Sequence, residues 1–197
     1  MSIVLAVRKR LGAKVSLKLA ILAFALTAVA ATIITWQQTR QMEELTLEKA
    51  RVAAAIGARQ YGDMFDAAID ASLVTVTDVF DRNYTPIKGH DWGDRPKFHT
   101  RYDALTDRAV TVFQDKFLEH EDFVFAVGVD ENGYLPTHNT IFQKPLTGDP
   151  AKDLAGNRTK RIFADPVGIA AAKNLEPSKL QVYNRDTGET MWDVSSP

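Results

Sequence analysis

The feature that most constrains this chain is an apolar stretch near its N-terminus. Residues 19–36, LAILAFALTAVAATIITW, contain no charged side chain. A helix rises about 1.5 Å per residue, so this stretch would be roughly 27 Å long, close to the bilayer hydrocarbon thickness of about 30 Å. The stretch therefore predicts a transmembrane helix.

The charges around this stretch predict its orientation. Five basic residues precede it, whereas the first acidic residue of the chain is Glu43. By the positive-inside rule, residues 1–18 form a basic cytoplasmic segment and everything after Trp36 is exported. Lys18 would reach the near headgroups and Trp36 the far ones. We expect a single-pass protein that contacts lipid of the inner membrane.

A cleaved signal peptide is the alternative, because the small residues Ala28, Ala30 and Ala31 resemble a cleavage site. Signal peptides usually have shorter apolar regions, of about 7–15 residues, which favours the uncleaved anchor. A buried helix of a soluble domain is a third interpretation.

Residues 37–80 contain no proline, and their apolar side chains recur every three or four positions. This pattern predicts a long amphipathic helix, or two helices in line, weakened near Gly57 and Gly62. Its apolar face would pack on the protein's own domain, on a second copy to give a homodimer, or on both.

Residues 81–99 are predicted to be loop, and a second helix is expected from Thr100, with Asp103 completing an approximate capping box. Its apolar face would carry Leu105, Ala109, Val112, Phe113 and Phe117.

Residues 123–195 are expected to form a four-stranded antiparallel sheet. FVFAVGVD (123–130) and residues 134–138 read as strands joined by a turn at Asn132 and Gly133. Residues 179–185 and 189–195 read as a second hairpin around positions 186–188. Between the hairpins, Asp165 is the expected N-cap of a short helix that begins at Pro166. The predicted class is therefore α+β.

Three phrases carry a resemblance to a known family: "VGVDENGYLPTHN", "KPLTGDPAKDLAGNRTKRIFADPVG" and "LQVYNRDTGETMWDVSSP". Following an anchor and a long helix, they resemble the sensor region of bacterial methyl-accepting chemotaxis proteins. More narrowly, residues 81–197 resemble a periplasmic Cache-type (PAS-like) sensor domain, in which an antiparallel sheet with flanking helices binds a small molecule.

The resemblance implies a receptor for chemotaxis that transmits ligand occupancy through helix movement. In that family one more strand, a second membrane helix, a HAMP linker and a cytoplasmic coiled coil follow. It therefore implies that the sensor domain is incomplete at its C-terminal end and that this chain alone does not signal. Some relatives carry covalent haem, which needs cysteines that this chain lacks. A membrane-anchored dimeric interaction protein without a ligand is the competing hypothesis.

Ligand-binding side chains are expected at strand ends and in the long connection, where PAS-like sheets hold their ligands. His138 and the arginines would suit a small carboxylate. Each candidate also has a plainer structural interpretation, such as the N-cap for Asp165. The candidates are Tyr134, His138, Asn139, Arg158, Lys160, Arg161, Asp165 and Tyr183.

Composition and motifs argue against several other functions. The net charge of −1 gives no attraction to nucleic acid. Without cysteine there is no disulfide, thiolate metal site or cysteine nucleophile. The histidines match no metal-ligand spacing, and no phosphate loop or hydrolase motif occurs, so we expect neither a cofactor nor an enzyme.

Overall fold

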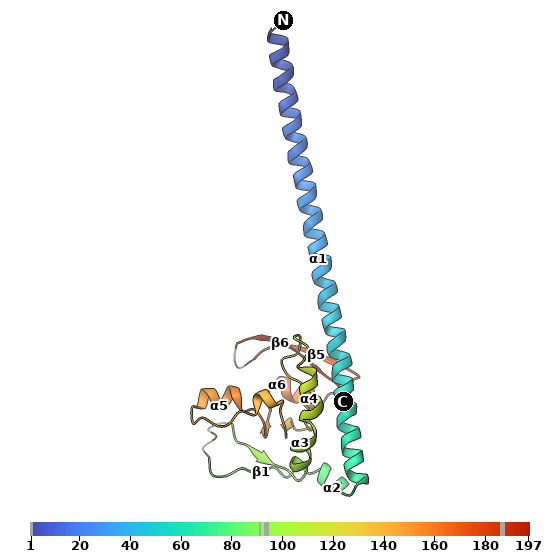
Figure 1. Ribbon diagram of the computed structural model, residues 1–197, viewed down its shortest axis with the longest axis vertical. Helices are drawn as coiled ribbons and strands as arrows, with labels where there is room; N and C mark the ends of the chain where they lie inside the picture. The colour runs from blue at the N-terminus through green and yellow to red at the C-terminus, as the bar shows by residue number, and fades with distance from the viewer. Residues whose placement is uncertain (1, 91, 93–94, 186–187) are drawn as a thin grey trace. The chain divides into compact units, whose positions relative to one another are not determined.

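The fold is described from a computed structural model of the chain (Figure 1). It describes residues 2–90, 92, 95–185 and 188–197, with side chains from position 12 onward. The chain divides into two compact units, Met1–Leu47 and Glu48–Pro197. Helix α1 (Ser2–Asp70) supplies the first unit and the opening segment of the second.

Helix α1 is continuous over 69 residues. Its Gly12–Asp70 portion is long and apolar enough to cross a membrane, with a mean hydropathy of 2.3 over its most apolar 18-residue window. The apolar side chains of that window are exposed, as a lipid-facing helix requires. The expected apolar helix is therefore present, and it runs through Gly57 and Gly62 without a break.

The long helix ends at Asp70, ten residues before the expected end at position 80. Ser72 then adopts a left-handed φ of 57°, and the amides of Ser72 and Leu73 donate to the last carbonyls of the helix. A short helix α2 (Val76–Val79) follows, with a reciprocal capping box between Thr75 and Asp78. These local caps stop α1 and start α2, although the apolar periodicity continues through both.

The predicted four-stranded sheet is wrong for the part of the chain that the structure describes, which holds three two-stranded antiparallel sheets. A single bridge between Lys97 and Arg161 links the first of these sheets to the second. Strand β1 (Thr85–Pro86) pairs with β2 (Phe98–His99), inside the expected loop. Strand β3 (Tyr134–Leu135) pairs with β4 (Arg161–Ile162), a strand that the sequence did not indicate. Only the hairpin of β5 (Lys179–Asn184) and β6 (Thr190–Ser195) was predicted with its correct partners. Positions 186 and 187 of its expected turn lie outside the described residues.

Residues 123–130 do not form the predicted strand. Two of their amides donate to side chains instead: Ala126 N–H to Asn139 Oδ1 at 2.9 Å, and Gly128 N–H to the Tyr61 hydroxyl at 3.2 Å. The predicted turn does occur, because Gly133 has a φ of 80° and its amide donates to Asp130 O. It leads into β3, which pairs with β4 rather than with residues 123–130.

The second expected helix is present in two pieces, α3 (Asp103–Ala109) and α4 (Thr111–Phe117). The expected capping box is absent, because Thr100 Oγ1 donates to the Asp103 carboxylate. Val112, placed by sequence on the apolar face, is 69% exposed, whereas Thr106 and Gln114 are buried.

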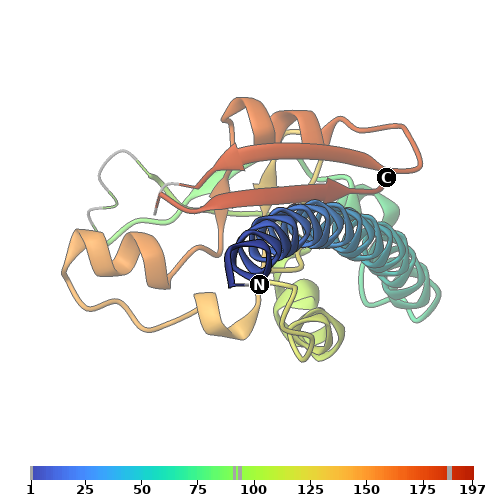
Figure 2. The same cartoon turned by 90° about the horizontal axis from the view of Figure 1, so that it is seen from above.

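Two further helices of the second unit begin with an aspartate cap and a proline. Helix α5 (Pro150–Gly156) was not predicted, whereas α6 (Pro166–Ala172) confirms the expected helix, with Asp165 Oδ1 accepting from the amides of Val167 and Gly168. A short 3₁₀ helix η1 (Thr140–Phe142) follows β3. Helix α6 lies along one face of the β5–β6 hairpin, where Gln181 Nε2 donates to Val167 O (Figure 2).

Aromatic side chains form the core of the second unit. Tyr61 and Phe65 of α1 meet Phe113 of α4 and Tyr102 edge to face, with ring centroids 5.3 Å and 6.0 Å apart. Tyr134 is fully buried beside Tyr102. This packing holds β3 and the residues after it against α3 and α4.

Candidate anion-binding site

The candidate site is built around His138, which follows β3 and is 3% exposed. The amide of Asn139 donates to His138 Nδ1 at 2.8 Å. A nitrogen that accepts carries no proton, so the neutral ring bears its hydrogen on Nε2. No hydrogen-bond acceptor for Nε2 occurs among the described residues. His138 therefore offers one N–H donor from an almost fully buried ring.

Aromatic rings hold the imidazole in place. The Phe142 ring of η1 lies 4.6 Å from it and the Phe125 ring 6.3 Å from it, centroid to centroid. The guanidinium carbon of Arg185 lies 5.1 Å from the centroid of the Phe142 ring, which is a cation–π distance. Phe142 thus joins His138 and Arg185 in one cluster.

Nearby arginines add positive charge to the environment of His138. Arg158 is 7% exposed, and its amide donates to Phe142 O at 2.8 Å. Burial lowers the pKa of His138 to about 3, with further lowering by the positive charges of Arg158, Arg185 and Arg161. The imidazole therefore stays neutral at physiological pH, and the fixed positive charge of the cluster is supplied by guanidinium groups.

Tyr183 connects this cluster to the hairpin. Burial raises the pKa of its hydroxyl, the nearby Asp193 carboxylate raises it further, and Arg185 and Arg158 lower it. Tyr183 belongs to the half-buried face of β5, which alternates with the exposed residues Val182 and Asn184. We call His138, Phe142, Arg158, Tyr183 and Arg185 the anion cluster.

Three of the predicted site residues belong to this cluster: His138, Arg158 and Tyr183. Arg185 is a member that the prediction missed. Its side chain is 9% exposed and pairs with Glu189 at 3.7 Å. The signal was available in the sequence, because position 185 continues the period-two pattern of Gln181 and Tyr183 on the inward face.

The remaining predicted residues hold the fold together. The Tyr134 hydroxyl lies within hydrogen-bond distance, 2.9–3.1 Å, of Phe98 O and of both carboxylate oxygens of Asp103. Asn139 accepts from Ala126 N–H and donates to Asp115 Oδ1. These hydrogen bonds fix the residues that flank His138.

The basic residues of the connection have separate roles. Lys160 Nζ lies 2.8 Å from both carboxylate oxygens of Asp107 and 3.2 Å from Asp103 Oδ2. Arg161 donates to the carbonyls of Leu154, Asp153 and Asn157 at the C-terminal end of α5, where a cation is favoured. Asp165 is an exposed N-cap. These three side chains are thus occupied outside the anion cluster.

The cluster has the chemistry of an anion receptor. It combines guanidinium groups, which bind carboxylates through paired N–H donors, with one fixed imidazole N–H and a phenol hydroxyl. Phe125 and Phe142 add an apolar wall. No group of three or more His, Cys, Asp or Glu side chains in the described part of the chain is arranged to hold a metal ion.

Comparison of the chain with models of protein families, with curated proteins and with solved structures found no match. The functional argument therefore rests on the geometry of this chain.

Proposed function

We propose that this chain is the sensor portion of a transmembrane receptor and that the anion cluster binds a small carboxylate. The observation that supports this most is the neutral His138 ring, with its proton on Nε2, held among the charges of Arg158 and Arg185. Positive charges in a low-dielectric environment attract an anion strongly. A carboxylate has the required negative charge, and its two oxygens match the paired N–H donors of a guanidinium group.

The finer features of the proposal rest on sequence. The basic residues before the apolar stretch support an N-terminus in the cytoplasm and a periplasmic sensor domain. The phrases quoted above support a Cache-type sensor of a chemotaxis receptor, a binding protein rather than an enzyme. Ligand occupancy would then favour one packing of α1, to the extent that the ligand binds the two packings with different affinities.

Thermal unfolding of the full chain in detergent tests this proposal with acetate, pyruvate and succinate. A ligand at about 100 times its Kd adds roughly 2.7 kcal/mol of stability, which for a chain of this size is a Tm increase of about 5–10 °C. We expect such an increase from at least one compound. We also expect it to be lost in Arg185→Gln and kept in Arg108→Gln, which replaces an exposed arginine of α3. The proposal is contradicted if the compounds change the Tm only as much as an inert salt of the same ionic strength does, and equally in the wild type, Arg185→Gln and Arg108→Gln.

A second candidate function is self-association through residues 37–80, as a membrane-anchored interaction protein. Seven large apolar side chains of this segment are exposed, and four of them lie close together on α1: Met42, Leu45, Val52 and Ile56. Their spacing of three, seven and four residues fits the a and d positions of a heptad seam. This seam supports a homodimer, with or without a ligand in the anion cluster.

A further inference from the structure

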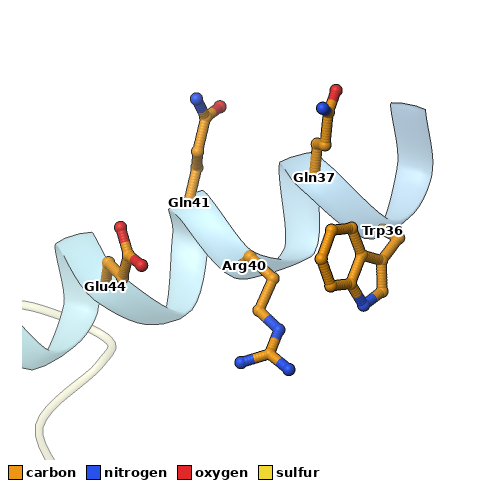
Figure 3. Close-up of a pocket in the computed structure, with 5 residues that line it drawn as sticks. All are labelled: Trp36, Gln37, Arg40, Gln41 and Glu44. Atoms are coloured by element: carbon orange, nitrogen blue, oxygen red, sulfur yellow. The ribbon is translucent and has the colours of Figure 1, made fainter. Parts of the chain in front are cut away.

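A second constellation lies on α1, immediately after the apolar stretch. The guanidinium carbon of Arg40 lies 5.4 Å from the centroid of the Trp36 ring. Figure 3 shows these two side chains on one side of the helix, with Gln37 and Gln41 extending from the other. Together with Glu44 they line a shallow depression on the helix surface. The Trp36 ring is 60% exposed, so the stacked pair is open to its surroundings.

Arg40 lacks an anionic partner in the part of the chain that the structure describes, and its side chain contacts the indole instead. An exposed arginine stacked on tryptophan keeps its planar fork of N–H donors unused. Such a fork suits the geometry of a phosphate group, and stacking limits the rotamer freedom that binding would otherwise remove. The pair is thus prepared to bind a phosphate oxygen.

The position of the pair identifies the source of the phosphate. Between Lys18 and Arg40 there is no charged residue. At about 1.5 Å per residue these two cations lie roughly 33 Å apart along the helix, which matches the bilayer hydrocarbon thickness of about 30 Å. Trp36 lies one turn inside Arg40, where tryptophan is enriched at membrane interfaces. When Lys18 is at one headgroup layer, Arg40 is at the other.

We propose that Trp36 and Arg40 form a binding site for the phosphodiester of a membrane phospholipid, which fixes the depth of α1 in the bilayer. Arg40 supplies the charged donors, and the Trp36 indole orients them. This inference rests on the membrane anchoring proposed above. Beyond that anchoring, it assigns a lipid chemistry to named side chains.

Cysteine scanning tests the proposal well, because the chain contains no native cysteine. Single cysteines at positions 26, 37, 41 and 59, the last an exposed position, are labelled with a membrane-impermeant maleimide in the full chain, reconstituted in phosphatidylcholine and phosphatidylglycerol vesicles. We expect Arg40→Gln to let the helix sink by up to about one turn, so that labelling at 37 and 41 slows. Arg51→Gln, which removes an exposed arginine further along α1, is the matched control and should change nothing.

Vesicles of a phosphate-free galactolipid separate phosphate binding from a general preference for interfaces. In galactolipid vesicles, cysteines 37 and 41 of the otherwise wild-type chain should be labelled as slowly as the same cysteines of Arg40→Gln are in phospholipid vesicles. The phosphate site is contradicted if the wild-type helix is labelled equally fast in phospholipid and galactolipid vesicles, or if Arg40→Gln does not change the labelling rate. Neither result would contradict the membrane anchor. If the cysteine at position 26 is labelled as fast as the one at the exposed position 59, the membrane anchor on which the inference rests is itself contradicted.

Discussion

At the scale of single residues, His138 shows how burial sets a protonation state. Its ring has one nitrogen committed to the Asn139 amide, is packed between Phe125 and Phe142, and faces guanidinium charges. Each of these disfavours the imidazolium form. A buried histidine of this kind acts as a fixed neutral donor instead of as a titrating group at physiological pH.

The low pKa of His138 predicts a specific loss of stability in acid. In the unfolded chain this group takes up a proton near pH 6.5, but in the folded chain only near pH 3. Between these values the unfolded state binds more protons, so stability falls as the pH falls. The slope approaches about 1.4 kcal/mol per pH unit for one such group. Denaturant unfolding at a series of pH values measures this slope.

The variant His138→Gln keeps an acceptor for the Asn139 amide but does not titrate, so its stability should depend less steeply on pH between 6.5 and 3. His90→Gln is the control, because His90 is exposed. If His138→Gln keeps the full wild-type slope while His90→Gln loses it, our account of the buried ring is wrong.

At the scale of elements, the turn before β3 depends on a glycine. Gly133 has a φ of +80°, and a Cβ added there would lie 2.5 Å from the Phe163 carbonyl oxygen. That carbonyl cannot withdraw easily, because the Phe163 amide donates to Gly133 O at 2.8 Å. The turn therefore extends the β3–β4 pairing by one hydrogen bond and positions the residues that lead to His138.

The substitution Gly133→Ala should be compared with Gly148→Ala. Gly148 has the same φ of +80°, but nothing lies within 4 Å of its added Cβ. Both variants should lose roughly 1–2 kcal/mol to left-handed backbone strain. Gly133→Ala should lose about 1–3 kcal/mol more through overpacking. Equal unfolding free energies for the two variants in denaturant titration would show that the Phe163 contact does not constrain the turn.

The exposed seam of α1 makes a prediction about association. A single cysteine replacing Val52, a seam position, should form an intermolecular disulfide readily under mild oxidation in the full chain. A cysteine replacing the neighbouring Arg51, which lies off the seam, should do so slowly. Gel mobility under non-reducing conditions measures both. Comparable rates for the two cysteines would argue against a heptad-packed dimer.

The elements that sequence predicted correctly are those defined by local signals. Helix α6 follows from Asp165 and Pro166, and the β5–β6 hairpin follows from two alternating strands close in sequence. Residues 123–130 had equally strong strand composition, but a strand also needs a partner, and partner choice is not local. In this fold Asn139 and Tyr61 side chains take two of the amides that a ladder would use.

The same distinction holds for the candidate site. Residue type and position near strand ends were enough to nominate His138, Arg158 and Tyr183. They were not enough to separate these from Lys160 and Asn139, whose partners Asp107 and Asp115 lie on α3 and α4. Only tertiary packing decides which polar side chains are brought together.

At the scale of the whole molecule, the chain combines a helix suited to a membrane with a compact unit of residues 48–197. Each unit carries one proposed anion-binding feature: the Trp36–Arg40 pair in the first and the anion cluster in the second. The first would hold a phospholipid phosphate and the second a soluble carboxylate. The central claim concerns the second, because a sensor must bind its ligand.

The most direct measurement is NMR of the arginine Nε–H signals in the full chain, labelled with ¹⁵N-arginine in detergent. The signals of Arg158 and Arg185 are assigned by their loss in the corresponding glutamine variants. On titration with the carboxylate that raises the Tm most, the account predicts that these two signals move together and saturate at one ligand per chain, while the signal of exposed Arg108 stays in place. Signals of Arg158 and Arg185 that do not move, or that drift without saturation in step with Arg108, would contradict it.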